Sequence, residues 1–186
     1  AKDLGAIVQV RTTINTHNFE QASDIYRLAN ELGADSFKIK PMFASGVAAT
    51  ETDDALIDSA DDIRNMQTEL VEMSPHMATR LDLPPPVFLS AELTAGKTNV
   101  KVLSCNCGVA SGYLSTNGDL YPCSYTVGGP DSDKYKMGNI RDDKFAAMWG
   151  QESEILDRYR SNVGSTECPS QAALINEVDG KDVYSI

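Results

Sequence analysis

Cysteine is the residue type in this sequence best suited to carry chemistry, and three of the four cysteines lie in one short stretch, CNCGVASGYLSTNGDLYPC, residues 105–123. The fourth, Cys168, follows much later in STECPS. Thiolates gathered near one point suit tetrahedral zinc or an iron–sulfur cluster, because soft thiolates select both. A disulfide and inert buried thiols are the alternatives. Zinc sites usually use Cys-x-x-Cys pairs, which this sequence lacks, so the spacing favours iron–sulfur.

The composition restricts the partners and the compartment. A formal charge of −11 argues against nucleic acid, because phosphate binding needs clustered Lys and Arg. No apolar run reaches the roughly 18–20 residues of a membrane span, and the N-terminus lacks the features of a secretory signal. We therefore expect a cytoplasmic protein with no membrane partner, in which grouped thiols bind metal more often than they form disulfides. His17 and His76 are far from the cysteines in sequence and are interpreted as ordinary polar residues.

A β-hairpin must position the clustered cysteines. Asn117-Gly118 predicts a type I′ turn between short β-prone arms in GYLSTNGDLYPCSYT. If the arms pair, Cys123 returns toward Cys107. Residues 142–160 are helical in pattern, and we expect Trp149 to anchor the core of this small domain. Cys168 then arrives from beyond that helix.

The N-terminal half predicts strands alternating with helices. Strands are expected at 6–14 and 35–43, and helices at 19–32 and 53–73. This order is typical of parallel βα units, which here would complete a larger barrel or sheet. In such folds the outer face of the sheet packs on helices, so the polar side chains of these two strands should point the other way, into a ligand cavity. The alternative is an edge strand with one solvated face. The polar side chains in question are Gln9, Arg11, Thr13, Lys38 and Lys40.

These patterns divide the chain into three parts. Residues 1–80 carry the βα units, residues 81–100 are expected to be a linker, because three prolines at 84–86 resist helix and sheet, and residues 101–186 form the cysteine-bearing domain. The first residue is not Met and a strand pattern begins almost at once, so we expect a piece of a longer protein.

The cysteine stretch resembles a known motif. In radical S-adenosylmethionine enzymes with a SPASM or twitch domain, the auxiliary-cluster motif is a cysteine, a variable spacer, a glycine and a second cysteine. Cys107, Gly118 and Cys123 stand at these positions, and YKMGNIRDDKFAAMWGQ is similar to the segment that follows the hairpin in that family. The N-terminal half is similar to the late βα units of the family's partial barrel.

The resemblance implies an α/β fold: late βα units of a partial (β/α) barrel, followed by a small α+β SPASM/twitch-like domain with a hairpin and a helix. It implies one auxiliary [4Fe–4S] cluster on Cys107 and Cys123, with Cys105 and Cys168 as the remaining ligands. Because only Cys168 follows the hairpin helix, a one-cluster, twitch-like domain fits better than a full SPASM domain. Arg11, Lys38 and Lys40 would hold an anionic part of cosubstrate or substrate.

The resemblance also implies limits. The Cys-x-x-x-Cys-x-x-Cys motif for the catalytic cluster is absent from this sequence, so S-adenosylmethionine and a second [4Fe–4S] cluster belong only to the full-length enzyme, with the missing N-terminal barrel half. The substrate would be a peptide or protein, or else a small molecule. The rival hypothesis is a non-catalytic zinc or iron–sulfur module that docks a peptide or protein partner.

Overall fold

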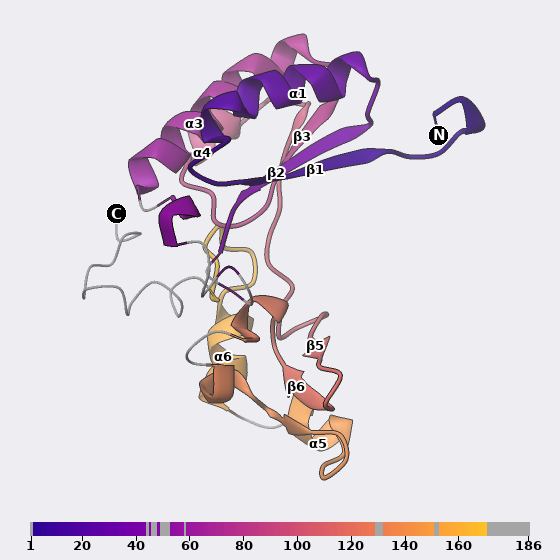
Figure 1. Cartoon of the computed structure of the whole chain (residues 1–186), viewed down its shortest axis with the longest axis vertical. Coiled ribbons are helices and arrows are strands. Elements are labelled where there is room, and N and C mark those ends of the chain that lie inside the picture. Colours follow the sequence, from indigo (N-terminus) through magenta and orange to yellow (C-terminus); the bar gives the residue numbers. More distant parts are fainter. Residues whose placement is uncertain are drawn as a thin grey trace. The chain divides into compact units, whose positions relative to one another are not determined.

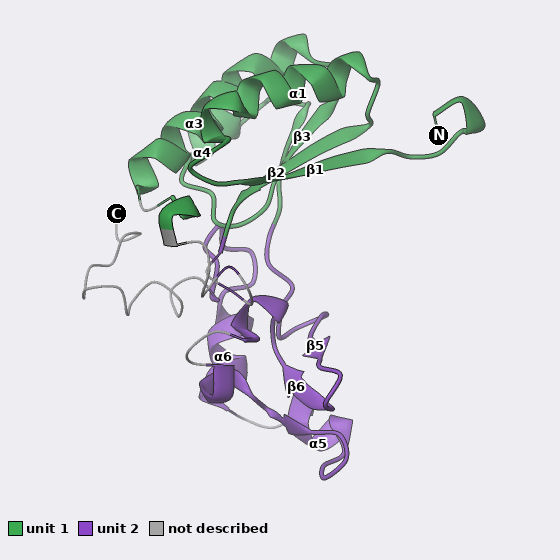
Figure 2. Cartoon of the chain, viewed as in Figure 1, with its two compact units in different colours: residues 1–42, 54–103 green, residues 43–53, 104–186 purple. Residues whose placement is uncertain are grey.

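A computed structural model describes residues 2–43, 45, 48, 53–57, 59–128, 132–150 and 153–170. The chain divides into two compact units, shown in Figure 2. Unit 1 comprises Ala1–Met42 and Asp54–Leu103, and unit 2 comprises Phe43–Asp53 and Ser104–Ile186. Residues 171–186 of the predicted cysteine-bearing domain lie outside the described residues. No helix in the described part of the chain is long and apolar enough to cross a membrane.

Unit 1 is a parallel sheet with helices on one face (Figure 1). The strands lie in the order β1-β2-β3-β4, and every pair is parallel. The bounds are β1 (Gln9–Ile14), α1 (Ala22–Glu31), β2 (Ser36–Pro41), α3 (Ala60–Met73), β3 (Arg80–Leu83), α4 (Ala91–Thr94) and β4 (Val100–Val102). The mixed α/β class is confirmed.

The core of unit 1 lies between this sheet and its helices. Tyr26 of α1 stacks on Phe37 of β2 with ring centroids 5.1 Å apart, and both side chains are fully buried. Ile63 and Leu70 of α3 are also fully buried. Burying an apolar side chain of this size stabilises the fold by about 1.5–3 kcal/mol. The helices therefore turn their apolar faces toward the sheet.

Both helices differ from the sequence prediction at their N-termini. Helix α3 begins at Ala60 rather than at Asp53, because Ser59 caps it by accepting a hydrogen bond of 3.1 Å from the Asp62 N–H. Helix α1 begins at Ala22, after a 3-10 turn at Phe19–Gln21. Its C-terminus lies close to the predicted residue 32, because Gly33 has φ +72° and ends the helix.

The predicted linker at 81–100 is wrong. The segment contains most of β3, all of α4 and the start of β4, and it belongs to unit 1. The prolines end β3 and pack onto the unit instead of leaving it. The buried side chain of Gln67 donates to the Pro86 carbonyl (3.0 Å) and accepts from the Phe88 N–H (2.9 Å), which fixes the chain there.

Unit 2 contains an antiparallel sheet in the order β5-β6-β7. Its elements are β5 (Tyr113–Leu114), β6 (Asp119–Tyr121), β7 (Gly138–Asn139), α5 (Phe145–Gly150) and α6 (Glu154–Ser161). The predicted single helix is therefore two, and α6 begins after Ser153, whose hydroxyl accepts from the Leu156 N–H (3.2 Å). Trp149 packs against a core of Leu120, Met137, Met148 and Leu156, as an anchor should.

The hairpin is confirmed, but its turn is not the predicted two-residue type. The Gly118 N–H donates to the Ser115 carbonyl (2.9 Å), and Ser115 N–H donates to the Asp119 carbonyl (2.8 Å). The turn therefore starts one residue earlier, and Gly118, with φ +89°, is its last residue and lies in the left-handed region. Asn139 of β7 holds this turn by donating to the Asn117 carbonyl (3.0 Å) and the Asp119 carboxylate (2.8 Å).

Candidate metal centre

The loop after Cys107 folds tightly against the end of β6. The N–H groups of Val109, Ala110 and Ser111 all donate to the Asn106 carbonyl at 2.9–3.2 Å. The Gly108 N–H donates to the Ser111 carbonyl (2.9 Å) and to the Pro122 carbonyl (3.2 Å). Because Pro122 immediately precedes Cys123, the second bond brings the backbone of Cys107 and Cys123 together.

Three thiols meet at this point. Cys107 is hydrogen-bonded to Cys105 and to Cys123, and these bonds together with burial raise the pKa of the Cys107 thiol. Cys123 is buried, and its sulfur accepts from the Tyr125 N–H at 3.5 Å. The Ser111 hydroxyl lies 3.9 Å from the Cys107 sulfur. Donors of this kind tune a thiolate ligand once it binds a metal.

Helix α6 connects the fourth cysteine to the other three. Tyr159 is 1% exposed, and its hydroxyl shares a hydrogen bond of 2.8 Å with the Ser170 hydroxyl, two residues beyond Cys168. Burial raises the pKa of Tyr159, the Ser170 bond lowers it, and the nearby Cys123, Cys168 and Cys107 raise it further. Tyr159 is therefore a common neighbour of thiols from both ends of the domain.

The same helix also supports the Cys107 loop. A Cβ at Gly108, which has φ +72°, would lie 2.6 Å from the Tyr159 Cβ, so only glycine fits. Arg160 donates to the Gly108 carbonyl (3.3 Å) and to the Trp149 carbonyl at the end of α5. In the sequence, Tyr159 is only one residue of the helical pattern at 142–160, and its positioning role could not be predicted because it depends on contacts between distant segments.

The donor set fits a thiolate-bound group, although the sulfur atoms do not form a closed metal cage. None of the four cysteines is in a disulfide, which removes that alternative for this structure. Within the described ranges, no group of three or more His, Cys, Asp or Glu side chains is already placed to hold a metal ion. The hydrogen bonds of Cys107 to Cys105 and to Cys123 nevertheless bring these three thiols together. Soft sulfur donors in that number suit iron–sulfur or zinc.

The predicted cofactor-binding residues lie in unit 1, on the sheet face opposite the buried core. Arg11 of β1 pairs in register with Lys38 of β2, and Thr13 pairs with Lys40. The Arg11 Nε donates to the Gln9 side chain at 2.7 Å. Gln9 in turn donates to the Asp82 carboxylate at 3.0 Å. Arg11 is exposed, and Lys38 and Lys40 are half-buried, so this polar face can receive a ligand.

Comparison with known proteins supports the cysteine-bearing unit. Residues 105–170 match the family SPASM, described as an iron–sulfur cluster-binding domain. The chain contains a SPASM domain. The matched residues include all four cysteines, Gly108, Tyr159 and Ser170. Unit 2 thus contains a domain of a family that is described as binding iron–sulfur clusters.

One relative extends the comparison to both units. The chain is 25% identical over 179 residues to an AdoMet-dependent heme synthase of Oleidesulfovibrio alaskensis, a match that covers 86% of this chain. The chain spans 42% of the length of that relative. No solved structure matches the chain. The SPASM domain and this AdoMet-dependent relative confirm the resemblance to the C-terminal portion of a radical S-adenosylmethionine enzyme with such a domain.

Proposed function

We propose that this chain is the C-terminal part of a radical S-adenosylmethionine enzyme and binds one auxiliary [4Fe–4S] cluster through Cys105, Cys107, Cys123 and Cys168. The observation that carries the proposal is the gathering of these cysteines by the hairpin and α6 inside a SPASM domain. When bound, such a cluster supplies one-electron redox chemistry at a potential set by ligation, hydrogen bonds to sulfur and burial.

The residues around the cysteines have separable tasks in this proposal. Cys123 is buried, and the Tyr125 N–H would stabilise its thiolate. The Tyr159–Ser170 hydrogen bond positions the segment that carries Cys168. Gly108 allows the Cys107 loop to approach α6 closely. Thiols with these roles must stay reduced, which supports a cytoplasmic location.

In the full-length enzyme, unit 1 would supply late βα units of a partial barrel. Its parallel strand order and one-sided helical layer support this role. The open polar face would then bind an anionic part of cosubstrate or substrate through Arg11, Lys38 and Lys40. Because most enzymes of this kind modify peptides or proteins, the substrate to be oxidised would be a peptide or protein. The name of the relative supports a small molecule instead.

A second candidate is a non-catalytic metal module that docks a protein or peptide partner. A hollow of about 340 Å³ in unit 2 favours it, lined by residues 109–112 together with Leu114, Leu120, Phe145 and Trp149. Phe145 stacks on Trp149 with centroids 5.6 Å apart, yet is 55% exposed. Leu114 lies on β5, an edge strand, and is 48% exposed. Exposed apolar side chains beside a strand edge are typical of peptide-binding surfaces.

Anaerobic reconstitution of single variants tests the proposal. Cys107→Ala and Cys123→Ala should each lose the cluster absorbance and most of the iron, because each removes a ligand. Ser104→Ala, next to the first cysteine, is the control and should keep both. Full iron content in the Cys123 variant would contradict the ligand assignment. Neither variant nor wild type should form 5′-deoxyadenosine, since the sequence lacks the catalytic-cluster motif.

A further inference from the structure

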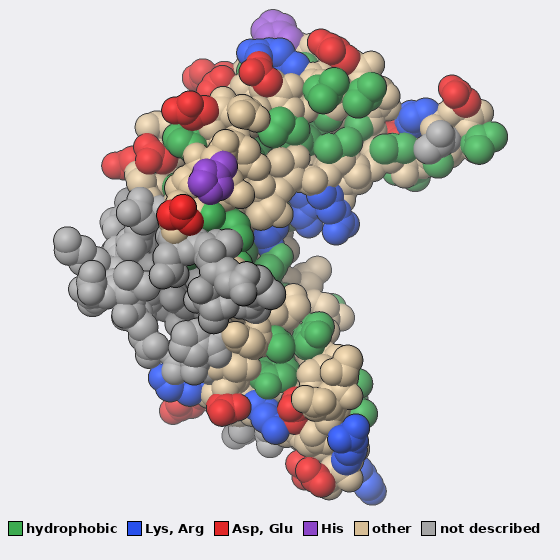
Figure 3. Space-filling model, in the orientation of Figure 1, with side chains coloured by type: hydrophobic (Ala, Val, Ile, Leu, Met, Phe, Trp, Pro, Cys, Tyr) green, Lys and Arg blue, Asp and Glu red, His purple; other side chains and the backbone are tan. Residues whose placement is uncertain are grey.

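A row of charged side chains crosses the open face of the sheet in unit 1. In the strand register, Arg11 lies beside Lys38, Lys38 beside Asp82, and Asp82 beside Lys101. Residues in register on neighbouring parallel strands share one face, so the four side chains form a line across β1 to β4. Lys and Arg side chains gather on this side of unit 1, whereas acidic side chains lie over the helices (Figure 3). In a chain with net charge −11, this local excess of positive charge requires an explanation.

The carboxylate in the row is already occupied. Asp82 is 3% exposed and accepts two hydrogen bonds from Arg80, at 2.7 and 3.0 Å, and one from Gln9 at 3.0 Å. In contrast, none of the three cations Arg11, Lys38 and Lys101 forms an ion pair with a carboxylate of the described residues. Among the described residues of unit 1, no carboxylate therefore pairs with these three cations.

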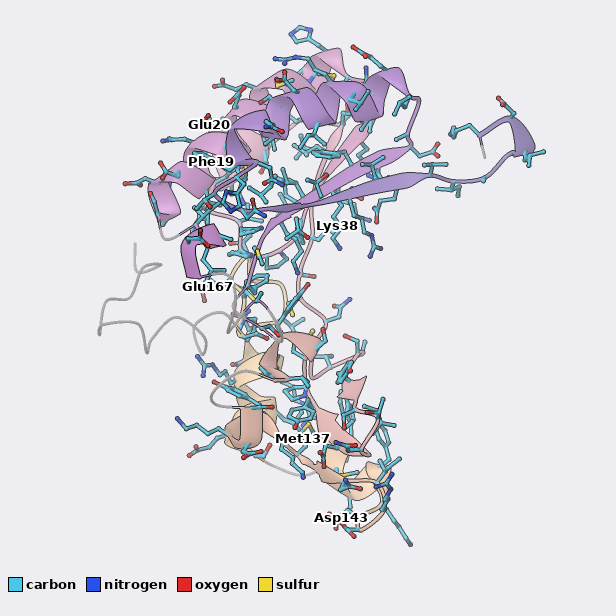
Figure 4. The ribbon with its side chains drawn as sticks, in the orientation of Figure 1. Phe19, Glu20, Lys38, Met137, Asp143 and Glu167 are labelled. Carbon is cyan, nitrogen blue, oxygen red and sulfur yellow. The ribbon has the colours of Figure 1, made fainter. Side chains whose placement is uncertain are left out.

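The surroundings of Lys38 support an anion at this position. Lys38 extends from β2 on the side away from α1 (Figure 4). Burial and the positive charge of Arg11 lower the pKa of Lys38, and only Asp82 acts in the opposite direction. An acid group seated between Arg11 and Lys38 would offset this repulsion. Lys101 lies two strands further along the row, about 10 Å from Lys38 at the usual strand spacing.

We infer that this row binds a ligand with two separated acid groups, one held by Arg11 and Lys38 and the other by Lys101. Asp82 lies between the two cationic positions and, being bonded to Arg80 and Gln9, offers no donor to an anion, so the spacing of the cations fits an elongated diacid. The inference rests on the proposed ligand-binding role of this face, and it adds Lys101 and the class of ligand. It does not depend on the cluster in unit 2.

Titration of the whole chain with defined probes, followed by amide NMR shifts in β1, β2 and β4, tests the inference. The probes are suberate, a linear dicarboxylate, and octanoate, its monoacid of the same length. Suberate should bind about fivefold more tightly at low salt, as expected for one additional exposed ion pair. Lys101→Gln should reduce suberate affinity to that of octanoate and leave octanoate unchanged. Lys38→Gln should weaken both, and Lys144→Gln in unit 2, which removes the same charge elsewhere, should affect neither.

Equal affinity for the two probes, or no effect of Lys101→Gln on suberate, would overturn the two-point assignment. If neither suberate nor octanoate binds, the site as a whole is overturned. Well-dispersed spectra of each variant verify folding. Iron content measured on the same samples separates the diacid site from the cluster. A chain that has a full cluster but binds no suberate contradicts only the diacid site. A chain that binds suberate but holds no iron contradicts only the proposed cluster.

Discussion

Gly108 and Tyr159 are in such close contact that a single methyl group would separate them: a Cβ on Gly108 would lie 2.6 Å from the Tyr159 Cβ and 3.1 Å from its Cγ. Gly108 directly follows Cys107, and Tyr159 is a buried residue of α6 whose pKa three of the thiols raise. The contact thus joins the loop of one candidate ligand to the helix that positions another.

Gly108→Ala should therefore destabilise unit 2 and reduce its iron content after reconstitution. The substitution forces alanine to φ +72° and against a Cβ that cannot rotate away, at a combined cost of about 2–4 kcal/mol. Gly164→Ala is the matched control, because Gly164 has φ +85° but no atom within 4 Å of the added Cβ. Chemical unfolding of both variants gives the difference, and equal losses would show that the Tyr159 contact does not matter.

The hydrogen bond between Tyr159 and Ser170 should hold the Cys168 segment in place. Tyr159→Phe and Ser170→Ala should each cost about 1 kcal/mol, and the double variant little more than either single one, because both remove the same bond. Electron paramagnetic resonance of the reduced cluster should change in line shape in both variants. Ser161→Ala, which removes an exposed hydroxyl of the same helix, should leave the spectrum unchanged. Fully additive losses would argue that the two hydroxyls act independently.

Unit 1 should lose stability at alkaline pH through Tyr26. Burial raises the pKa of Tyr26 from 10.0 to about 12. The folded state therefore keeps the neutral phenol, so its stabilisation is complete below pH 10 and is lost as pH rises toward 12, by a few kcal/mol at most. Tyr26→Phe should be less stable at pH 8, since its hydroxyl donates to the Thr79 carbonyl at 2.7 Å, but should show a flatter pH dependence. Urea unfolding at pH 8 to 11 measures this. Tyr113→Phe, at an exposed site on β5, should keep the wild-type slope.

Asn139 should stabilise the hairpin turn between Cys107 and Cys123. Its amide donates to the Asn117 carbonyl and the Asp119 carboxylate, so Asn139→Ala should cost about 1–3 kcal/mol and raise hydrogen exchange in β5 and β6. Asn162→Ala, which removes an amide that donates to the Glu167 carbonyl outside the hairpin, is the control. Unchanged hydrogen exchange in the Asn139 variant would mean that the turn is stable without the Asn139 hydrogen bonds.

Local chemistry made part of this fold predictable from sequence. Gly33 and Gly118 have the positive φ that turns require, and the apolar pattern identified α1 and α3. Strands β3 and β4 were missed because they are short and carry Asp82 and Lys101. Those residues pair across the sheet, a relationship that no local pattern contains.

The candidate site was predictable only as a set of cysteines. Their number and spacing are sufficient to indicate soft-ligand chemistry. Their positioning depends on Gly108, Tyr159, Arg160 and Ser170, which meet through the packing of α6 on distant loops. Only Gly108 had a local signal, because a glycine directly after a ligand cysteine permits close backbone approach.

Auxiliary-cluster binding is tested by the iron, sulfide and zinc content of the chain after anaerobic purification and reconstitution. We expect about four irons and about four sulfides per chain, with a paramagnetic signal after reduction. One zinc and no sulfide would make the cysteine site a structural staple and contradict the auxiliary-cluster function. A chain with neither iron nor zinc would contradict metal binding altogether.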